Sequence, residues 1–372
     1  MEEDSNSKEN NIKILDKSTC TGCMACKNIC PKNAIIIKEN NEGFNYPEID
    51  NSLCINCGLC KKACPILTKL SENTSEIKIY SCKNKDKEVR MNSSSGGIFT
   101  LIAKYILEKN GVVFGAKFNE KFEVVHDYIE NINDIGIFRG SKYLQSQINN
   151  TYKKVKNFLD ENRQVLFTGT PCQVEGLLSY LGKDYNNLYT QDFVCHGVPS
   201  PKVWRKYLEY KKEEEGVYPK NINFRRKDIL GWSNYQVSYK YLNKEENIHH
   251  DDEPYMKMFL KNLDLRTSCF NCQFKKTKRK SDITVADFWG INNVNPKMND
   301  ETGISALLIN SKKGQEIFDS IKDNMEFEKA NLEDIIKYNS CISISTNYNK
   351  KRAEFFKDLD TISFKELIEK YL

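Results

Sequence analysis

CTGCMACKNICP, residues 20–31, spaces four cysteines as C-x2-C-x2-C-x3-C and follows the last of them with proline. Residues 54–65, CINCGLCKKACP, repeat the same spacing and the same final proline. In paired motifs of this kind, three thiolates of each copy bind one 4Fe–4S cluster, and the cysteine before proline binds the other cluster. The repeat therefore predicts two clusters, whose ligands are Cys20, Cys23, Cys26 and Cys64 for the first and Cys54, Cys57, Cys60 and Cys30 for the second.

Zinc knuckles and unrelated structural thiols are the competing interpretations of these cysteines. Two identical four-cysteine repeats that both end in proline argue strongly against each of them. Residues 12–70 as a whole resemble the bacterial two-cluster ferredoxin, an α+β domain. Because such a module only passes single electrons, we expect the chemistry of this protein to lie further along the chain.

The composition is that of a folded protein with two domains. The chain has 372 residues, of which 39% are hydrophobic, and its net charge of +5 comes from interleaved basic and acidic side chains. This charge pattern argues against nucleic-acid binding. Residues 1–11 are polar, so we expect a disordered start without a signal peptide. No apolar run reaches membrane-spanning length, and we expect a cytoplasmic protein whose 14 cysteines stay reduced.

Beyond residue 78 the patterns of strands and helices alternate, which is typical of an α/β domain with a partly parallel sheet. Residues 93–111 predict an amphipathic helix introduced by SSSGG, and VVFGAKF at 112–118 predicts the next strand. Further strands of this mixed sheet are expected at 123–129, 164–168, 188–195, 222–226, 234–242, 282–290 and 305–310, and further helices at 147–161, 174–182, 201–212, 312–323, 350–359 and 363–371. We assign this α/β domain to residues 78–345, followed by C-terminal helices over 346–372.

Two cysteines follow strands of the predicted sheet. GTPC at 169–172 and CHG at 195–197 each come directly after a strand, and open α/β sheets bind ligands beyond the carboxyl ends of their strands. Cys172 and Cys195 are therefore expected at one edge of the sheet. Cys82 and Cys341 lack partners at ligand spacing, and we expect them to be ordinary core residues.

RTSCFNCQFKK, residues 266–276, adds a C-x-x-C pair, Cys269 and Cys272, which could complete a set of four with Cys172 and Cys195. A closed zinc site, unrelated thiols and a third 4Fe–4S cluster remain open for this set, whereas the polar and basic flanks fit a thioredoxin-like dithiol poorly. The cluster is favoured, because a redox site in the larger domain needs a relay to the first two clusters.

Other motifs are less specific. The chain contains neither G-x-G-x-x-G nor G-x-x-x-x-G-K-[ST], so neither a standard dinucleotide fold nor a P-loop is supported. SSSGG at 93–97 could hold a phosphate at a helix start or simply cap the helix. His196 is equally suited to a structural hydrogen bond or a proton transfer. The basic tract, whose members could attract an anionic ligand or form a solvated loop, is Lys275, Lys276, Lys278, Arg279 and Lys280.

Seven motifs in order carry a resemblance to a known family. They are SSSGGIFTLIAKYIL (93–107), RGSKYLQS (139–146), FTGTPCQVEGL (167–177), DFVCHGVPSPKVWRKYL (192–208), NFRRKDILGW (223–232), CFNCQFK (269–275) and SDITVADFWG (281–290). Together they resemble the coenzyme F420 hydrogenase/dehydrogenase beta-subunit family, in the form that begins with a two-cluster ferredoxin domain. Ala286 departs from the glycine expected before Asp287.

The resemblance implies an iron–sulfur flavoprotein oxidoreductase with a mixed-sheet α/β, FAD-binding domain. It would transfer electrons between coenzyme F420, or a similar hydride carrier, and 4Fe–4S clusters through FAD. The third cluster on Cys172, Cys195, Cys269 and Cys272 is favoured further. Asp287 and Trp289 could line the flavin pocket or simply pack. The residues that the resemblance implies for FAD binding are Ser94, Ser95, Gly96, Gly97, Lys142, Gly169, Thr170 and Pro171.

The resemblance assigns no catalytic residue, and it leaves the substrate and partners open. Expected partners are a ferredoxin or a hydrogenase or dehydrogenase subunit, with no nucleic acid and no membrane. Two alternative functions remain: a ferredoxin-dependent FAD reductase of an organic substrate, for example in polysaccharide metabolism, and a non-catalytic electron-transfer subunit of a larger enzyme.

Overall fold

The computed structural model describes residues 16–68, 70 and 76–372. The disorder predicted for residues 1–11 lies outside these ranges. Within them, every helix is too short or too polar to cross a lipid bilayer.

The N-terminal segment carries the two cysteine repeats on two short helices and their flanking loops, with a hairpin between them. Helix α1 spans Ala25–Ile29 and helix α2 spans Leu59–Lys62, with the antiparallel strands β1 (Ile35–Glu39) and β2 (Asn45–Ile49) between them. The residue before each helix has a left-handed backbone, with φ of 63° at Met24 and 73° at Gly58. The sequence repeat is therefore also a repeat of backbone conformation, and it folds three cysteines of each motif into one tight loop.

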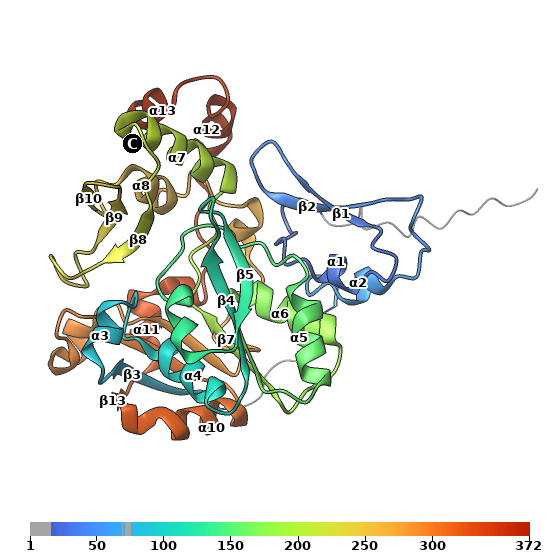
Figure 1. The fold of residues 1–372 in the computed structure, drawn as a ribbon, viewed down its shortest axis with the longest axis vertical. Coiled ribbons are helices and arrows are strands. Elements are labelled where there is room, and N and C mark those ends of the chain that lie inside the picture. The colour runs from blue at the N-terminus through green and yellow to red at the C-terminus, as the bar shows by residue number, and fades with distance from the viewer. Residues whose placement is uncertain (1–15, 69, 71–75) are drawn as a thin grey trace, which may run out of the picture.

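An eight-stranded mixed sheet forms the centre of the rest of the chain (Figure 1). Its strand order is β13-β3-β12-β11-β7-β6-β4-β5, and the β11–β7, β7–β6 and β6–β4 pairs are parallel while the others are antiparallel. The mixed sheet predicted from the sequence is confirmed. The strands span β3 Lys78–Asn84, β4 Val112–Phe118, β5 Val124–Ile129, β6 Val165–Gly169, β7 Leu188–Phe193, β11 Ile283–Asp287, β12 Ser305–Ile309 and β13 Met325–Lys329.

Helices cover both faces of this sheet. Along β6, Val165 and Phe167 pack under α5 (Thr151–Asp160) and α6 (Pro171–Leu181), whereas Leu166 packs on the opposite face. That opposite face is covered by α4 (Ile98–Leu107) and α10 (Lys312–Ile321). Shorter elements lie on both faces. With α4 and α10 are α3 Lys87–Met91 and the 3-10 turns η2 Ile132–Phe138 and η5 Lys322–Asn324. On the other face, α9 Ile291–Val294, α11 Leu332–Tyr338 and the 3-10 turns η4 Pro296–Met298 and η6 Ser340–Ile342 pack with Ala306 and Leu308 of β12.

Helix α6 starts earlier than the sequence analysis predicted. We expected a helix from residue 174, but it begins at Pro171, after a capping box in which Thr170 and Gln173 bond reciprocally. Proline suits the first helical position because it lacks the N–H that would have no partner there. Cys172 therefore lies in the first turn of α6 rather than in a loop.

A separate three-stranded sheet corrects a second prediction. β8 (Asn221–Arg226) and β9 (Gln236–Lys240) were expected in the main sheet, but they pair with each other and with β10 (Glu245–His249). Along β8 buried residues alternate with exposed ones over the first four positions, whereas β12 is buried throughout. This alternation is typical of an antiparallel sheet with one face in solvent.

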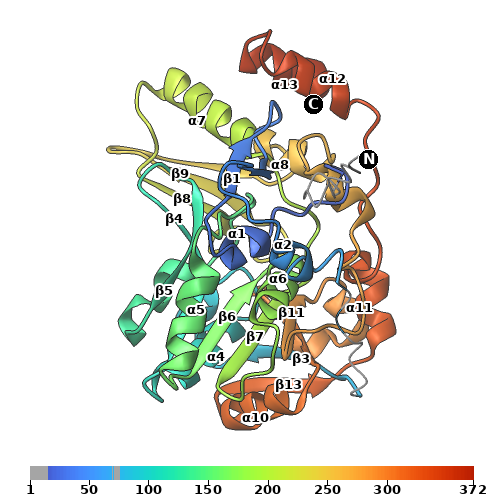
Figure 2. The same ribbon diagram turned by 90° about the vertical axis from the view of Figure 1, so that its right-hand side faces the viewer.

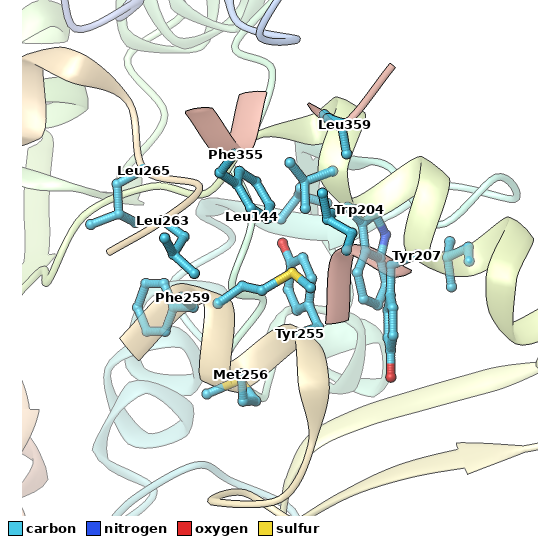
Figure 3. Packing of buried hydrophobic residues seen from close by; sticks show 14 of the residues in the cluster. Leu144, Trp204, Tyr207, Tyr255, Met256, Phe259, Leu263, Leu265, Phe355 and Leu359 are labelled. Atoms are coloured by element: carbon cyan, nitrogen blue, oxygen red, sulfur yellow. The ribbon is translucent and has the colours of Figure 1, made fainter. Parts of the chain in front are cut away.

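The second sheet packs on a helical layer made by α7 (Pro201–Glu215), α8 (Pro254–Leu260), α12 (Arg352–Asp358) and α13 (Phe364–Tyr371). Figure 3 shows its aromatic centre, where Trp204 lies 4.7 Å from Tyr255 between ring centroids. The same hydrophobic cluster includes Phe44 and Tyr46 of the N-terminal segment. In Figure 2, α1 and α2 lie over α6. The N-terminal segment is thus packed both against the helical layer of the second sheet and against helix α6 of the main sheet.

Trp204 provides a test of this core. Its side chain is buried, and its indole N–H donates to the carbonyl of Phe122 at 2.8 Å. We expect Trp204→Ala to lower the free energy of unfolding by about 3–5 kcal/mol, because it leaves a cavity among aromatic rings. Trp204→Phe should cost clearly less. Thermal unfolding followed by circular dichroism checks the order, and equal losses would contradict the packing role.

Candidate functional site

A cavity of about 560 Å³ opens where the parallel strands of the main sheet end. Gly169 of β6, Phe193 of β7 and Asp287 of β11 are the last residues of their strands, and all three line it. Ligands of open α/β sheets bind in this position, and the volume suits a large organic ligand.

The residues that the resemblance implied for FAD binding divide into two groups. Two of the eight lie off the cavity wall. A Cβ built on Gly96 would lie 2.6 Å from the carbonyl oxygen of Cys82, so this glycine serves close packing on β3. Pro171 instead faces the adjoining cysteine cavity. The members that line the large cavity are Ser94, Ser95, Gly97, Lys142, Gly169 and Thr170.

The SSSGG segment places the start of helix α4 on the cavity wall. Gly97 is the N-cap residue, with φ of 77°, and the helix has no side-chain cap. The serine hydroxyls bond elsewhere: Ser94 accepts from the Ser141 N–H, and Ser95 donates to the carbonyl of Ile304. The uncapped N-terminus of a ten-residue helix faces the cavity, and this arrangement favours an anionic group there.

Lys142 is held by its own loop. Its ammonium donates to the carbonyls of Phe138, Arg139 and Gly140 at 3.1–3.3 Å. Desolvation lowers the pKa of Lys142 to about 8. Lys142 therefore contributes positive charge to the wall at neutral pH, while its donors are engaged by the loop.

An ion pair that the sequence analysis missed also lines the cavity. The Arg225 guanidinium lies 3.1 Å from Oδ2 of Asp287 and stacks 4.1 Å above the ring of Tyr235. Trp289 also lines the cavity and stacks on Trp232 at 4.7 Å. Arg225 lies in a strand with alternating burial, which does not mark it as a site residue. Only its ion pair with Asp287, from a distant strand, identifies it as part of the cavity wall.

The four cysteines of the proposed third set surround one smaller cavity. Cys172 comes from α6, Cys195 follows β7, and Cys269 and Cys272 lie on and after the 3-10 turn η3 (Thr267–Asn271). Desolvation raises the pKa of Cys172 well above its usual range, and the neighbouring thiolates of Cys272 and Cys195 raise it further. Four partly buried thiols that repel one another when ionised form a donor set that suits a cationic metal centre.

The spacing of these sulfur atoms bears on the choice between a closed zinc site and a cluster. Tetrahedral Zn–S bonds of about 2.3 Å would bring all four sulfurs within about 3.8 Å of each other. Over the described residues, the only group of three or more His, Cys, Asp or Glu ligand atoms within 4.8 Å is His249, His250 and Asp251. Among the described residues no cysteine set is thus as compact as a closed zinc site, and this spacing favours the wider arrangement of a cluster.

The two N-terminal sets have the same architecture. Cys20, Cys23, Cys26 and Cys64 line one small cavity, and Cys30, Cys54, Cys57 and Cys60 line another, which is the exchange of ligands predicted from the repeat. Each cavity has about 30 Å³ of free space at its centre. We refer to them as the inner and the outer set, because Cys57 of the second one is exposed.

The cavities adjoin one another in a row. The large cavity shares Thr170 and Cys195 with the third set, and the third set shares Thr21 with the inner set. Cys60 lines both the inner and the outer cavity. The residues therefore make a continuous path from the large cavity to the surface at Cys57.

His196 and the neighbouring basic tract have mainly structural contacts. Nε2 of His196 lies 2.7 Å from Oδ1 of Asn262, and its carbonyl accepts from Lys275 at 3.0 Å. Arg279 is buried and pairs with Asp192. The basic tract is thus only partly a solvated loop. Cys341, expected in the core, lines the large cavity with its Sγ 3.5 Å from Nδ1 of His196.

Comparisons with known proteins agree with these observations. Residues 79–153 match the N-terminal model, and residues 162–335 the C-terminal model, of the coenzyme F420 hydrogenase/dehydrogenase beta subunit, and together these span more than half of the chain. Residues 19–67 match the 4Fe-4S dicluster domain. No curated protein matches the chain.

One solved structure that resembles this chain is a xenon derivative of the F420-reducing [NiFe] hydrogenase complex from Methanosarcina barkeri. A chain of that complex aligns with a TM-score of 0.48 and 17% identity, over 81% of this chain and 93% of its own length.

The third set can be tested with a matched pair of cysteine variants. We expect Cys269→Ser to remove about four irons per chain, because a cubane that loses one of its four ligands binds weakly. Cys341→Ser, a nearby cysteine outside the set, should keep the full iron content. Iron and zinc analysis of anaerobically purified protein checks both. Equal iron in the two variants, or stoichiometric zinc, would refute a cluster at this set.

Proposed function

The chain belongs to the coenzyme F420 hydrogenase/dehydrogenase beta-subunit family, and on that basis we propose that it is an iron–sulfur flavoprotein. In this proposal it exchanges electrons between a hydride carrier, coenzyme F420 or a similar compound, and 4Fe–4S clusters through FAD. The proposed sites are the large cavity for FAD and the third, inner and outer cysteine sets for three clusters.

The observation that carries this proposal is the row of adjoining cavities. A ligand in the large cavity would lie next to the third set, since Thr170, Gln173, Cys195 and His196 line both. Between the third and inner sets, Gly176 has no side chain, and a Cβ built on it would lie 3.0 Å from Sγ of Cys23. Short steps between redox groups are what an electron relay requires.

The walls of the large cavity suit a dinucleotide. The uncapped start of α4 and the partly desolvated Lys142 favour the phosphates, while aromatic side chains, including Tyr235 and Trp289, offer surfaces for a planar ring system. A flavin bound there would supply the conversion between hydride transfer and single-electron transfer. The protein's part is to bind the ring, to exclude water and to hold the third set nearby.

The outer set is the proposed exit toward a redox partner. Leu53 and Ile55 are 50% and 58% exposed beside the exposed Cys57. Residues 51–68 contain Lys61 and Lys62 but no Asp or Glu. An apolar patch with basic neighbours fits an acidic ferredoxin-type carrier, for which charge complementarity accelerates docking.

The hydride carrier can be tested directly. We expect anaerobically purified protein to contain about one FAD and on the order of twelve irons per chain. Rapid mixing with reduced coenzyme F420 should bleach the flavin absorbance. If the cofactors are present and the flavin does not bleach, the assignment of coenzyme F420 as the hydride carrier is wrong. A reductase of another substrate is then favoured. If FAD is absent from iron-loaded protein, the flavin site itself is wrong.

The exit can be tested with charge-reversed surface variants. We expect Leu53→Glu combined with Lys62→Glu to slow electron transfer to an acidic ferredoxin about tenfold at low salt, because both changes repel an acidic partner. The difference should shrink as salt is added. Flavin reduction by the hydride carrier should stay unchanged. Leu242→Glu, at an exposed apolar residue after β9, is the control. An equal loss in the control would contradict docking at the outer set.

A further inference from the structure

Arg266 is a buried arginine without a carboxylate partner. Its side chain is fully buried. The other four buried arginines each form an ion pair: Arg90 with Asp300, Arg225 with Asp287, Arg279 with Asp192 and Arg352 with Glu42. Across the described part of the chain, no such pair involves Arg266. A buried guanidinium needs a compensating negative charge, so its surroundings should contain one.

The nearest acidic residue in sequence does not supply this charge. Asp264 is buried, and neither of its carboxyl oxygens accepts a hydrogen bond. Desolvation raises the pKa of Asp264 to about 7, and Arg352 is the cation that acts against this rise. Arg266 stacks 4.1 Å above the ring of Tyr46, which stabilises the cation in part but supplies no full negative charge, so its hydrogen-bond partners are the next contacts to consider.

The guanidinium of Arg266 is directed at the inner cysteine set. Nε donates to the carbonyl of Cys20 at 2.8 Å, and Nη2 lies 3.9 Å from the Sγ atom of Cys20. Nη1 donates to Gln145, and Nη2 also donates to the carbonyl of Asn45. Gly22 permits this approach, because a Cβ built there would lie 3.1 Å from Cζ of Arg266.

The backbone of Arg266 forms hydrogen bonds with the segments that carry the third set. The Arg266 N–H donates to the carbonyl of Val198, three residues after Cys195, and its carbonyl accepts from the N–H of Cys269. Its positive charge also lowers the pKa of the Cys269 thiol, against the larger effect of burial. Arg266 therefore lies between the two sets and contacts both.

We propose that Arg266 is a positioning residue that raises the reduction potential of the inner cluster above that of the outer one. The inference rests on the proposed clusters. A 4Fe–4S cluster on four thiolates is a net anion, which supplies the missing counter-charge. Reduction adds one more negative charge, so a fixed cation and an N–H···S contact stabilise the reduced form more than the oxidised form. Among the described residues that line the outer cavity, Lys32 is the only cation, and its side chain is exposed rather than buried like Arg266.

Redox titration followed by EPR tests this asymmetry. In the wild-type protein we expect one of the two N-terminal clusters to reduce first. Arg266→Gln should move that signal alone to a more negative potential, while Arg266→Lys, which keeps the charge, should largely restore it. The double variant Arg352→Gln with Glu42→Gln is the matched control, because it removes a buried guanidinium together with its carboxylate. It should leave all midpoint potentials in place.

The possible outcomes separate this inference from the proposed function. If Arg266→Gln retains all its iron and no potential moves, or if both N-terminal clusters shift equally, the tuning role is wrong and the clusters stand. If the double variant shifts the same signal equally, the effect is one of packing and the tuning role is again wrong. If the wild-type protein shows no cluster at the inner set, the proposed function fails with it.

Discussion

The arrangement of the redox sites depends on the packing of the first cysteine loop against helix α6. Met24 and Ala25 lie in one hydrophobic cluster with Val174 and Leu177, which fixes the N-terminal segment on the larger part. Cys172 and Gly176 are four residues apart in α6 and therefore share a face, about 6 Å apart along the axis. Because Gly176 contacts Cys23, this single helix sets the separation between the third and inner sets.

The electrostatics follow from the same packing. Burial, and to a lesser degree repulsion from ionised thiols of their own sets, raises the pKa of Cys23 and of Cys195 to about 12. Cations at the interface reduce this repulsion, and Arg266 is the one that reaches two sets. Elsewhere in the described chain the buried arginines are neutralised locally by carboxylates. The interface thus differs from the ordinary core in having a buried positive charge whose partner is a thiol.

Features set by short segments could be predicted from the sequence, and features set by distant contacts could not. The cysteine repeat, the strands from β4 to β7 and the position of the cavity at their ends all follow from local pattern and spacing. The start of α6 was placed three residues late, although Pro171 and the Thr170–Gln173 capping box were readable signals. β8 and β9 were placed in the wrong sheet, because strand pattern alone does not name the partner strand. Arg225 and Arg266 were missed for a related reason: the sequence around an arginine does not indicate which distant group its side chain contacts.

The origin of the third set in distant segments has a consequence for biogenesis. The inner and outer sets are complete once synthesis has passed Cys64, so their ligands are available on a short nascent chain. The third set needs Cys172, Cys195 and the pair at Cys269 and Cys272, and these meet only after β6, β7 and η3 have come together. If the third set binds the proposed cluster, metal delivery to this protein would occur in two stages, an early one on the N-terminal segment and a late one on a nearly folded domain.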